Sequence, residues 1–154
     1  MTSQDLCLEA NVFVSAFSPH AQYHQEALTF LQGLRQDKNG EARMLYEPAL
    51  VLYDVSQALY EQQKRGELSK LDHQDLMEHL NSLPLIFQWS PEVLELTHKL
   101  AAQYSFQNIY ETAYLAIAMS RDIPLVTFDE ETLSKSRKAY KKVYGYQDCY
   151  RLVG

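Results

Sequence analysis

Apolar residues along the chain fall into two alternating patterns. Short apolar runs bounded by polar or turn-forming residues are typical of buried strands. They cover residues 6–8, 44–46, 85–89 and 124–128. Between them, apolar side chains recur every three or four positions, as Ala27, Phe30 and Leu34 do, and this spacing predicts helices. Strands that alternate with helices predict a parallel sheet with helices on both faces.

Capping and turn residues set the ends of several expected helices. Pro48 suits the first turn of a helix that runs to about residue 65. Ser69 is a candidate N-cap for a helix that ends near residue 80, and Ser90 is a candidate cap followed by a first-turn proline. Residues 36–40 predict a turn. Further helices are expected over residues 11–17, 22–36 and 110–121.

Length and composition indicate one globular domain. The chain has 154 residues, of which 46% are hydrophobic, so it can bury a continuous core, and we expect a single domain over residues 1–154. No apolar run is long enough to span a bilayer, and no secretory signal is visible. Two distant cysteines, Cys7 and Cys149, are typical of reduced thiols. These features predict a cytoplasmic protein without a membrane partner.

Charge is distributed unevenly. The net charge is −6, yet residues 135–151 carry six basic residues and one acidic residue, whereas residues 1–134 carry 8 basic and 19 acidic residues. A basic strip on an acidic body allows local binding of a polyanion, and tyrosines within it, such as Tyr144 and Tyr150, can stack on unpaired bases. The alternative is a solvated helix face, followed by aromatic residues that pack a last strand onto the sheet.

Four acidic residues stand where a solvated charge is unexpected. Glu9 and Asp129 each follow an apolar strand. Asp54 interrupts an apolar helical stripe, and Glu111 opens a helix rich in small apolar residues. A lone charge on such a stripe costs several kcal/mol unless it is paired or protonated. Because sites in parallel sheets lie at the carboxyl ends of the strands, we expect the four carboxylates to converge there.

Converging carboxylates repel one another, and a divalent cation offsets that repulsion. Mg²⁺ and Mn²⁺ prefer oxygen ligands, and such ions activate water and stabilise charge on a phosphate. The four acids therefore indicate a Mg²⁺ or Mn²⁺ site. A structural role stays open for each acid singly. Asp129 can cap a helix that begins at Glu130, and Glu111 can interact with a helix dipole.

The order of these acids resembles that of the PIN-domain family over nearly the whole chain. Residues 9–13 are similar to the family's opening acidic motif after the first strand, and residues 48–55 to its second motif, where the acid follows an apolar run. Residues 111–118 are similar to the third motif, with the aromatic Tyr114 three residues after the acid. Residues 124–129 are similar to the fourth motif.

The resemblance implies a three-layer α/β/α sandwich with a central, mainly parallel sheet. It also implies a metal-dependent endoribonuclease that hydrolyses RNA phosphodiester bonds with Mg²⁺ or Mn²⁺. Its implied catalytic residues and metal ligands are Glu9, Asp54, Glu111 and Asp129. Many such small domains are the toxin of a toxin–antitoxin pair, so an antitoxin-like protein partner and a homodimer are further expectations. Asn11 and Thr127, each two residues from an acid, are candidate auxiliary residues that hold a water or a carboxylate.

Three of the four acids differ in length from the family's usual residues. The family usually has Asp, Glu and Asp where this chain has Glu9, Asp54 and Glu111. One methylene moves a carboxylate by about 1.5 Å, whereas a preorganised site tolerates about 0.5 Å. Two hypotheses follow. The chain is a ribonuclease whose site is rebuilt around the changed lengths, or it is a catalytically silent PIN-like domain that binds RNA or a protein partner.

Overall fold

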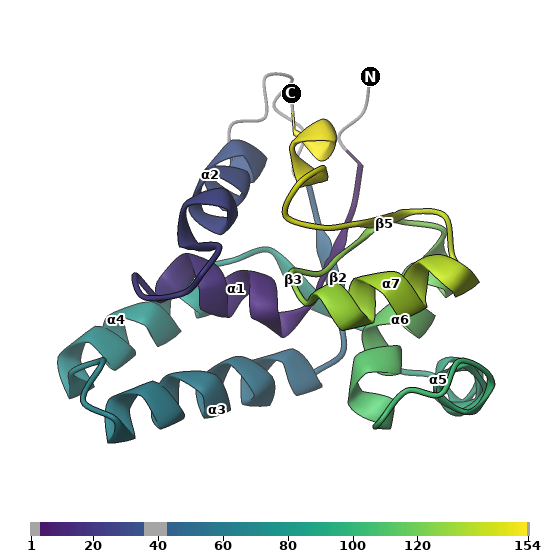
Figure 1. The fold of residues 1–154 in the computed structure, drawn as a ribbon, viewed down its shortest axis with the longest axis horizontal. Coiled ribbons are helices and arrows are strands. Elements are labelled where there is room, and N and C mark those ends of the chain that lie inside the picture. The colour runs from purple at the N-terminus through teal and green to yellow at the C-terminus, as the bar shows by residue number, and fades with distance from the viewer. Residues whose placement is uncertain (1–3, 36–42, 154) are drawn as a thin grey trace.

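The computed structural model describes residues 4–35 and 43–153 (Figure 1). The turn expected at residues 36–40 lies outside this range. The elements follow in the order β1 (Cys7–Leu8), α1 (Ala10–Phe17), α2 (His24–Arg35), β2 (Leu45–Glu47), α3 (Leu50–Lys64), α4 (Lys70–Asn81), β3 (Leu85–Phe87), α5 (Pro91–Gln103), α6 (Ile109–Arg121), β4 (Leu125–Val126), α7 (Glu130–Ala139), β5 (Val143–Tyr144) and the 3-10 helix η1 (Cys149–Leu152).

All of the described strand pairs are parallel, as the alternating pattern predicts. β4 lies between β1 and β5, and β2 pairs with β3. A single parallel bridge between Leu6 and Leu45 joins the two groups. The strands therefore follow the spatial order β3-β2-β1-β4-β5, and their carboxyl ends share one edge. The expected α/β class with a mainly parallel sheet is confirmed, although β1, β3 and β4 are shorter than the apolar runs that predict them.

A buried side chain separates β1 from β2 beyond that bridge. The Leu6 and Tyr46 amides still donate across the two strands, to Met44 O at 3.1 Å and to Leu6 O at 2.9 Å. The next amide, that of Leu8, instead donates to Glu47 Oε1 at 2.6 Å. The Glu47 carboxyl thus takes the place of a backbone acceptor at the point where the strands part, directly before Glu9.

Helices cover both sides of the strands. In Figure 1, α1 to α4 lie on the left of the strands and α5 to α7 on the right. Helix α6 contacts β1, β2 and β4, and Thr112 and Tyr114–Ala118 are buried on it. A helix that is apolar around most of its circumference belongs in a core. Within the described residues, no helix is both long enough and apolar enough to cross a bilayer.

The expected caps form, and the basic C-terminal strip is partly used by the fold. Ser69 accepts from the Asp72 amide and Ser90 from the Val93 amide, each at 3.1 Å. Three of the strip's cations face carboxylates, in the pairs Lys135–Glu131, Arg137–Asp148 and Lys142–Asp122. Its aromatic residues mostly pack. The Tyr140 hydroxyl donates to Ile123 O at 2.8 Å, and Tyr146 stacks on Tyr23 with 3.8 Å between ring centres.

Candidate acidic site

One pocket at the carboxyl edge of the sheet brings the four predicted acids together. It has a volume of about 260 Å³. Its lining includes Glu9, Asp54, Glu111 and Asp129, together with Ala10, Asn11, Asn108, Tyr110, Tyr114 and Thr132. The four acids come from the start of α1, the second turn of α3, the first turn of α6 and the residue before α7. Their role as ligands or catalysts stays a prediction.

Glu9 is the most deeply buried of the four acids, at 5% exposure. Its amide donates to Val126 O at 2.9 Å, which continues the β1–β4 pairing, and its backbone then turns into α1. Its Oε2 accepts from Asn11 Nδ2 at 2.9 Å and from the Thr127 hydroxyl. Asn11 Oδ1 also accepts from the Phe128 amide at 2.7 Å. The two candidate auxiliary residues thus tie Glu9 to the end of β4.

Burial raises the pKa of Glu9 to about 7. The hydrogen bonds from Thr127 and Asn11 oppose the shift, whereas the neighbouring charges of Glu111 and Asp129 add to it. Without a cation, this carboxyl therefore holds a proton up to about neutral pH. The bonds to Oε2 leave Oε1 without a donor among the described residues.

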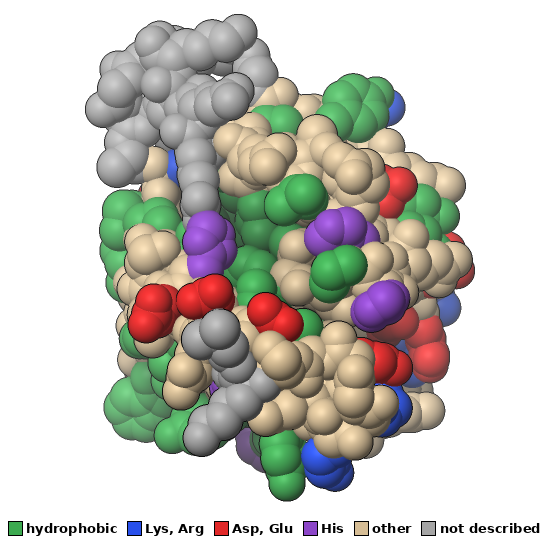
Figure 2. Space-filling model, turned by 90° about the vertical axis from the view of Figure 1, so that its left-hand side faces the viewer, with side chains coloured by type: hydrophobic (Ala, Val, Ile, Leu, Met, Phe, Trp, Pro, Cys, Tyr) green, Lys and Arg blue, Asp and Glu red, His purple; other side chains and the backbone are tan. Residues whose placement is uncertain are grey.

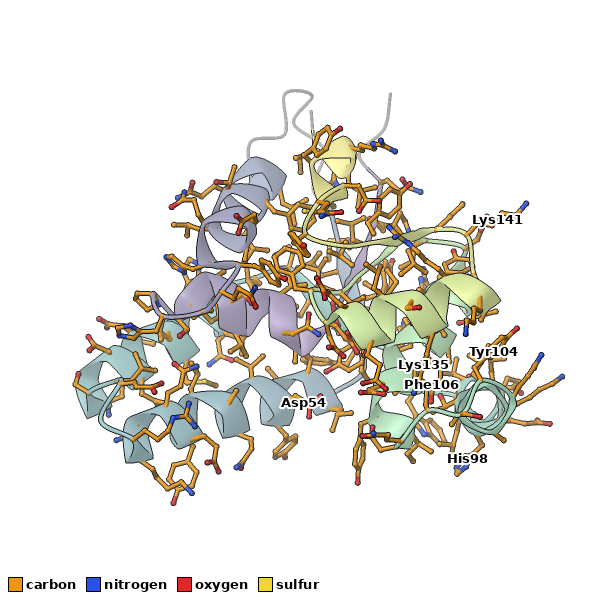
Figure 3. All side chains as sticks on the ribbon, in the orientation of Figure 1. Asp54, His98, Tyr104, Phe106, Lys135 and Lys141 are labelled. Atoms are coloured by element: carbon orange, nitrogen blue, oxygen red, sulfur yellow. The ribbon has the colours of Figure 1, made fainter. Side chains whose placement is uncertain are left out.

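Asp54 is half-buried on α3, and its hydrogen-bond partner is Tyr114, the aromatic residue of the third motif. The Tyr114 hydroxyl of α6 donates to Asp54 Oδ2 at 2.7 Å. Burial raises the pKa of Asp54, and this hydrogen bond opposes the shift. Figure 3 shows Asp54 near the start of α3, on the side where α3 approaches α6. Tyr114 therefore joins two of the helices that form the pocket.

Glu111 owes its position to the cap of α6. Asn108 Oδ1 accepts from the Tyr110 and Glu111 amides at 3.0 and 3.3 Å, which starts the helix beside the pocket. Burial and the Asp129 charge raise the pKa of Glu111, and Lys135 opposes the shift. Lys135 donates to Ser105 O at 3.0 Å and lies beside Phe106 (Figure 3), so this cation is held at the rim.

Asp129 serves as the N-cap of α7, the structural role that the sequence left open. Its Oδ2 accepts from the Thr132 amide at 3.3 Å and from the Thr132 hydroxyl at 2.6 Å. Capping uses one oxygen, and no described residue donates to the other. The cap therefore orients Asp129 without exhausting its capacity to bind a cation.

Three helix N-termini face the pocket, because Glu9 precedes α1, Glu111 lies in the first turn of α6 and Asp129 precedes α7. Each N-terminus carries a partial positive charge of about half an elementary charge. These partial charges offset some of the repulsion among the carboxylates, which explains how an acidic pocket is tolerated in the folded chain.

The donor chemistry of the pocket fits a hard divalent cation. Its acids supply oxygen donors only, which suits Mg²⁺ and Mn²⁺ and not a softer metal. In the described part of the chain, no three acidic, histidine or cysteine side chains already stand as a finished metal cage. Binding would therefore require the carboxylates to turn inward, which their unbonded oxygens allow.

Sequence reasoning missed Glu47, the last residue of β2, which is fully buried. Burial raises the pKa of Glu47 well above its ordinary value, and the charge of Glu9 adds to the shift. The carboxyl bonds to the Leu8 amide, and Cys7 Sγ lies 3.9 Å from Oε2. An acidic residue between Tyr46 and Pro48 at a strand end gives no sign of burial, whereas Asn108 could have been found as a cap-forming residue before an apolar helix.

A separate apolar hollow lies between α1, α2 and α4. It has a volume of about 370 Å³, and its lining includes Phe17, Leu28, Leu31, Leu76 and His79. Figure 2 shows this side of the molecule, where hydrophobic side chains gather among acidic and histidine side chains. The hollow shares no lining residue with the acidic pocket.

Solved structures resemble this fold closely, although their sequences differ. PAE2754 from Pyrobaculum aerophilum matches with a TM-score of 0.69 and 16% identity, over 97% of this chain and 96% of that one. VapC20 of Mycobacterium tuberculosis, described as a sarcin–ricin loop cleaving toxin, matches with a TM-score of 0.63 and 8% identity, over 84% and 94%. FitAcB from Neisseria gonorrhoeae matches with a TM-score of 0.62 and 12% identity, over 93% and 99%.

These structural neighbours have PIN-like α/β folds, and the present chain shares that fold. The resemblance noted in the four motifs is thus confirmed at the level of structure. No protein-family model matches the sequence, and no curated protein matches it either.

Proposed function

We propose that this chain is a metal-dependent endoribonuclease that uses the acidic pocket to hydrolyse RNA phosphodiester bonds. The observation that carries the proposal is the shared pocket of Glu9, Asp54, Glu111 and Asp129 at the carboxyl edge of a PIN-like sheet. The fold shared with VapC20, a toxin described as cleaving the sarcin–ricin loop, supports the choice of RNA as substrate.

Each acid has a defined part in this proposal. Glu9, held by Thr127 and Asn11, and Asp129, held by Thr132, would hold the cation. Asp54, oriented by Tyr114, and Glu111 complete the donor set. When bound, Mg²⁺ or Mn²⁺ lowers the pKa of water and offsets charge that develops on the phosphate. The carboxylates form no covalent bond to the substrate.

The test is cleavage of single-stranded RNA and of total RNA in Mn²⁺ by the wild type, Glu9→Gln, Glu9→Asp and the triple variant with Glu9→Asp, Asp54→Glu and Glu111→Asp. Glu9→Gln keeps the length and removes the charge, so it should abolish cleavage. If the site is rebuilt around Glu9, Glu9→Asp should also lose activity. If instead the changed side-chain lengths of the acids weaken the nuclease, the triple variant should gain activity. The triple variant is needed because neighbouring ligands couple. Four folded but inert proteins would contradict the proposal.

The second candidate is a catalytically silent domain that binds RNA or an antitoxin-like protein partner. Two observations favour it: the three changed acid lengths and the lack of a finished metal cage among the described residues. The apolar hollow beside α4 gives a protein partner a surface to cover. A catalytically silent domain should show no cleavage in any of the four proteins, and their melting temperatures should not respond to millimolar Mn²⁺. Whether the chain forms a homodimer is measured directly by sedimentation velocity.

A further inference from the structure

A second hollow lies along α3 and adjoins the acidic pocket. Its volume is about 590 Å³, and it shares Asp54 and Tyr110 with the pocket. From that junction it runs past Tyr53 and Tyr60 of α3. A polymer cut at the pocket must leave it over the adjoining surface, and this hollow adjoins the pocket at Asp54 and Tyr110.

Exposed tyrosine rings form the wall of this hollow. Tyr53 is 75% exposed, Tyr110 56% and Tyr60 52%. Leaving large rings in water forgoes stabilisation that burial would give. Elsewhere the chain uses its tyrosines, since Tyr114 bonds Asp54 and Tyr146 stacks on Tyr23. Tyr53 and Tyr60, in contrast, are mostly exposed, so burial of their rings contributes little to the stability of the fold.

The spacing of the rings suits separate flat ligands on one face. Tyr53 and Tyr60 are seven residues apart, which places them on the same side of α3 and about 10.5 Å apart along its axis. This separation is about three times the 3.4 Å step between bases of a duplex strand. The two rings would therefore contact different bases of an unpaired strand and not a single stack.

The hollow also avoids negative charge beyond its junction with the pocket. Among the described residues that line it, Asp54 alone is a carboxylate. Gln63 supplies a neutral amide, whereas the Gln57 amide donates to Glu61 Oε1 at 2.8 Å. Lys64 Nζ lies 5.0 Å from the centre of the Tyr60 ring and 3.2 Å from Glu61 Oε1. At the Tyr60 end of the hollow, the charge of Glu61 is therefore offset by that of Lys64. For a chain with net charge −6, this is a surface that a polyanion can approach.

We propose that the Tyr53–Tyr60 hollow binds the unpaired bases of single-stranded RNA and leads the strand into the acidic pocket. Stacking on aromatic rings tolerates any base, and the Gln63 amide at the wall can bond to a base edge. The inference rests on the proposed function, because it names how that substrate is held. The stacking role that the sequence suggested for the C-terminal tyrosines is thereby assigned to α3.

The experiment measures binding of a fluorescently labelled ten-nucleotide single-stranded RNA by anisotropy, in a Glu9→Gln background so that the strand is not cut. Tyr53→Ala should weaken binding about 5- to 150-fold, the equivalent of one stacked base. Tyr53→Phe keeps the ring and should bind as the parent does. The matched control is Tyr150→Ala, which removes a ring that is 62% exposed on η1, at the opposite end of the molecule from α3 (Figure 1).

Equal affinity of Tyr53→Ala and the parent would overturn the inference, as would an equal loss in Tyr150→Ala. So would a change from dimer to monomer in Tyr53→Ala with RNA affinity retained, because the face would then be a contact between two copies. If the wild type cleaves RNA and Tyr53→Ala binds RNA as the parent does, this inference is contradicted and the nuclease proposal stands. If Tyr53→Ala loses RNA binding and the wild type shows no cleavage, the nuclease proposal is contradicted and the RNA-binding inference is supported.

Discussion

Replacing the buried Glu47 carboxyl by an amide should make the stability of this protein less sensitive to pH. Glu47 is fully buried, accepts from the Leu8 amide at 2.6 Å, and has a pKa raised well above its ordinary value, first by burial. Glu47→Gln retains a carbonyl acceptor for the Leu8 amide and removes the titration.

The sign of the effect follows from the direction of the shift. Between the ordinary value near 4.5 and the raised value, the folded state holds the Glu47 proton and the unfolded state does not. Stability is therefore fully present below the ordinary pKa and is lost as pH rises towards the folded pKa. The slope of this loss is at most about 1.4 kcal/mol per pH unit. Glu47→Gln cannot titrate at this position, so its unfolding free energy does not fall with pH for this reason. Glu9 titrates with the same sign in both proteins, so its contribution largely cancels in the difference.

Urea unfolding at pH 5, 6 and 7 measures the difference in unfolding free energy, Glu47→Gln minus wild type. This difference should rise steadily from pH 5 to pH 7, because the raised pKa lets Glu47 keep its proton in the folded state while the unfolded state loses it. The matched control is Glu95→Gln, which removes an exposed carboxyl on α5, and the Glu47→Gln trend must exceed it. A difference that stays constant over this range would refute the reasoning, because Glu47 would then be ionised in the folded protein.

Two further predictions concern the pocket. Tyr114→Phe removes the hydroxyl that donates to Asp54 and should lower the free energy of unfolding in urea by about 1 kcal/mol; an unchanged value would show that this bond contributes nothing. Because the pKa of Glu9 is raised to about 7, its proton must leave before a cation binds, so Mn²⁺ affinity by calorimetry should increase from pH 6 to pH 8; a flat affinity would contradict this.

Local chemistry made several elements predictable. Ser90 and Pro91 mark the start of α5 because a hydroxyl cap and a proline both suit an N-terminus that lacks backbone acceptors. Asp129 likewise stands where a cap is expected before Glu130, and it forms that cap. The convergence of the four acids followed from their positions at strand ends and helix starts, which a parallel sheet brings to one edge.

The rest depended on contacts between distant segments. Glu47 looks like an ordinary polar residue at a strand end, and only the separation of β1 from β2 gives its carboxyl a backbone donor. The hydroxyl of Tyr114 reaches Asp54 across 60 residues of sequence, which no local pattern encodes. Tyr53 carries no mark of exposure in a helix that also buries Val51 and Val55, because the side of α3 left uncovered is set by the packing of other elements.

The most direct test of the account is the melting temperature of the wild type and of Asp129→Asn as Mn²⁺ is increased to millimolar concentration. Asparagine still caps a helix, so this variant keeps the start of α7 and removes one carboxylate from the pocket. A cation that binds only the folded state adds about 3 kcal/mol at a hundredfold excess over its Kd, or several degrees. The account predicts that the wild type melts at progressively higher temperature while Asp129→Asn responds far less. Equal responses of the two proteins, or no response in the wild type, would contradict a cation site formed by these four acids.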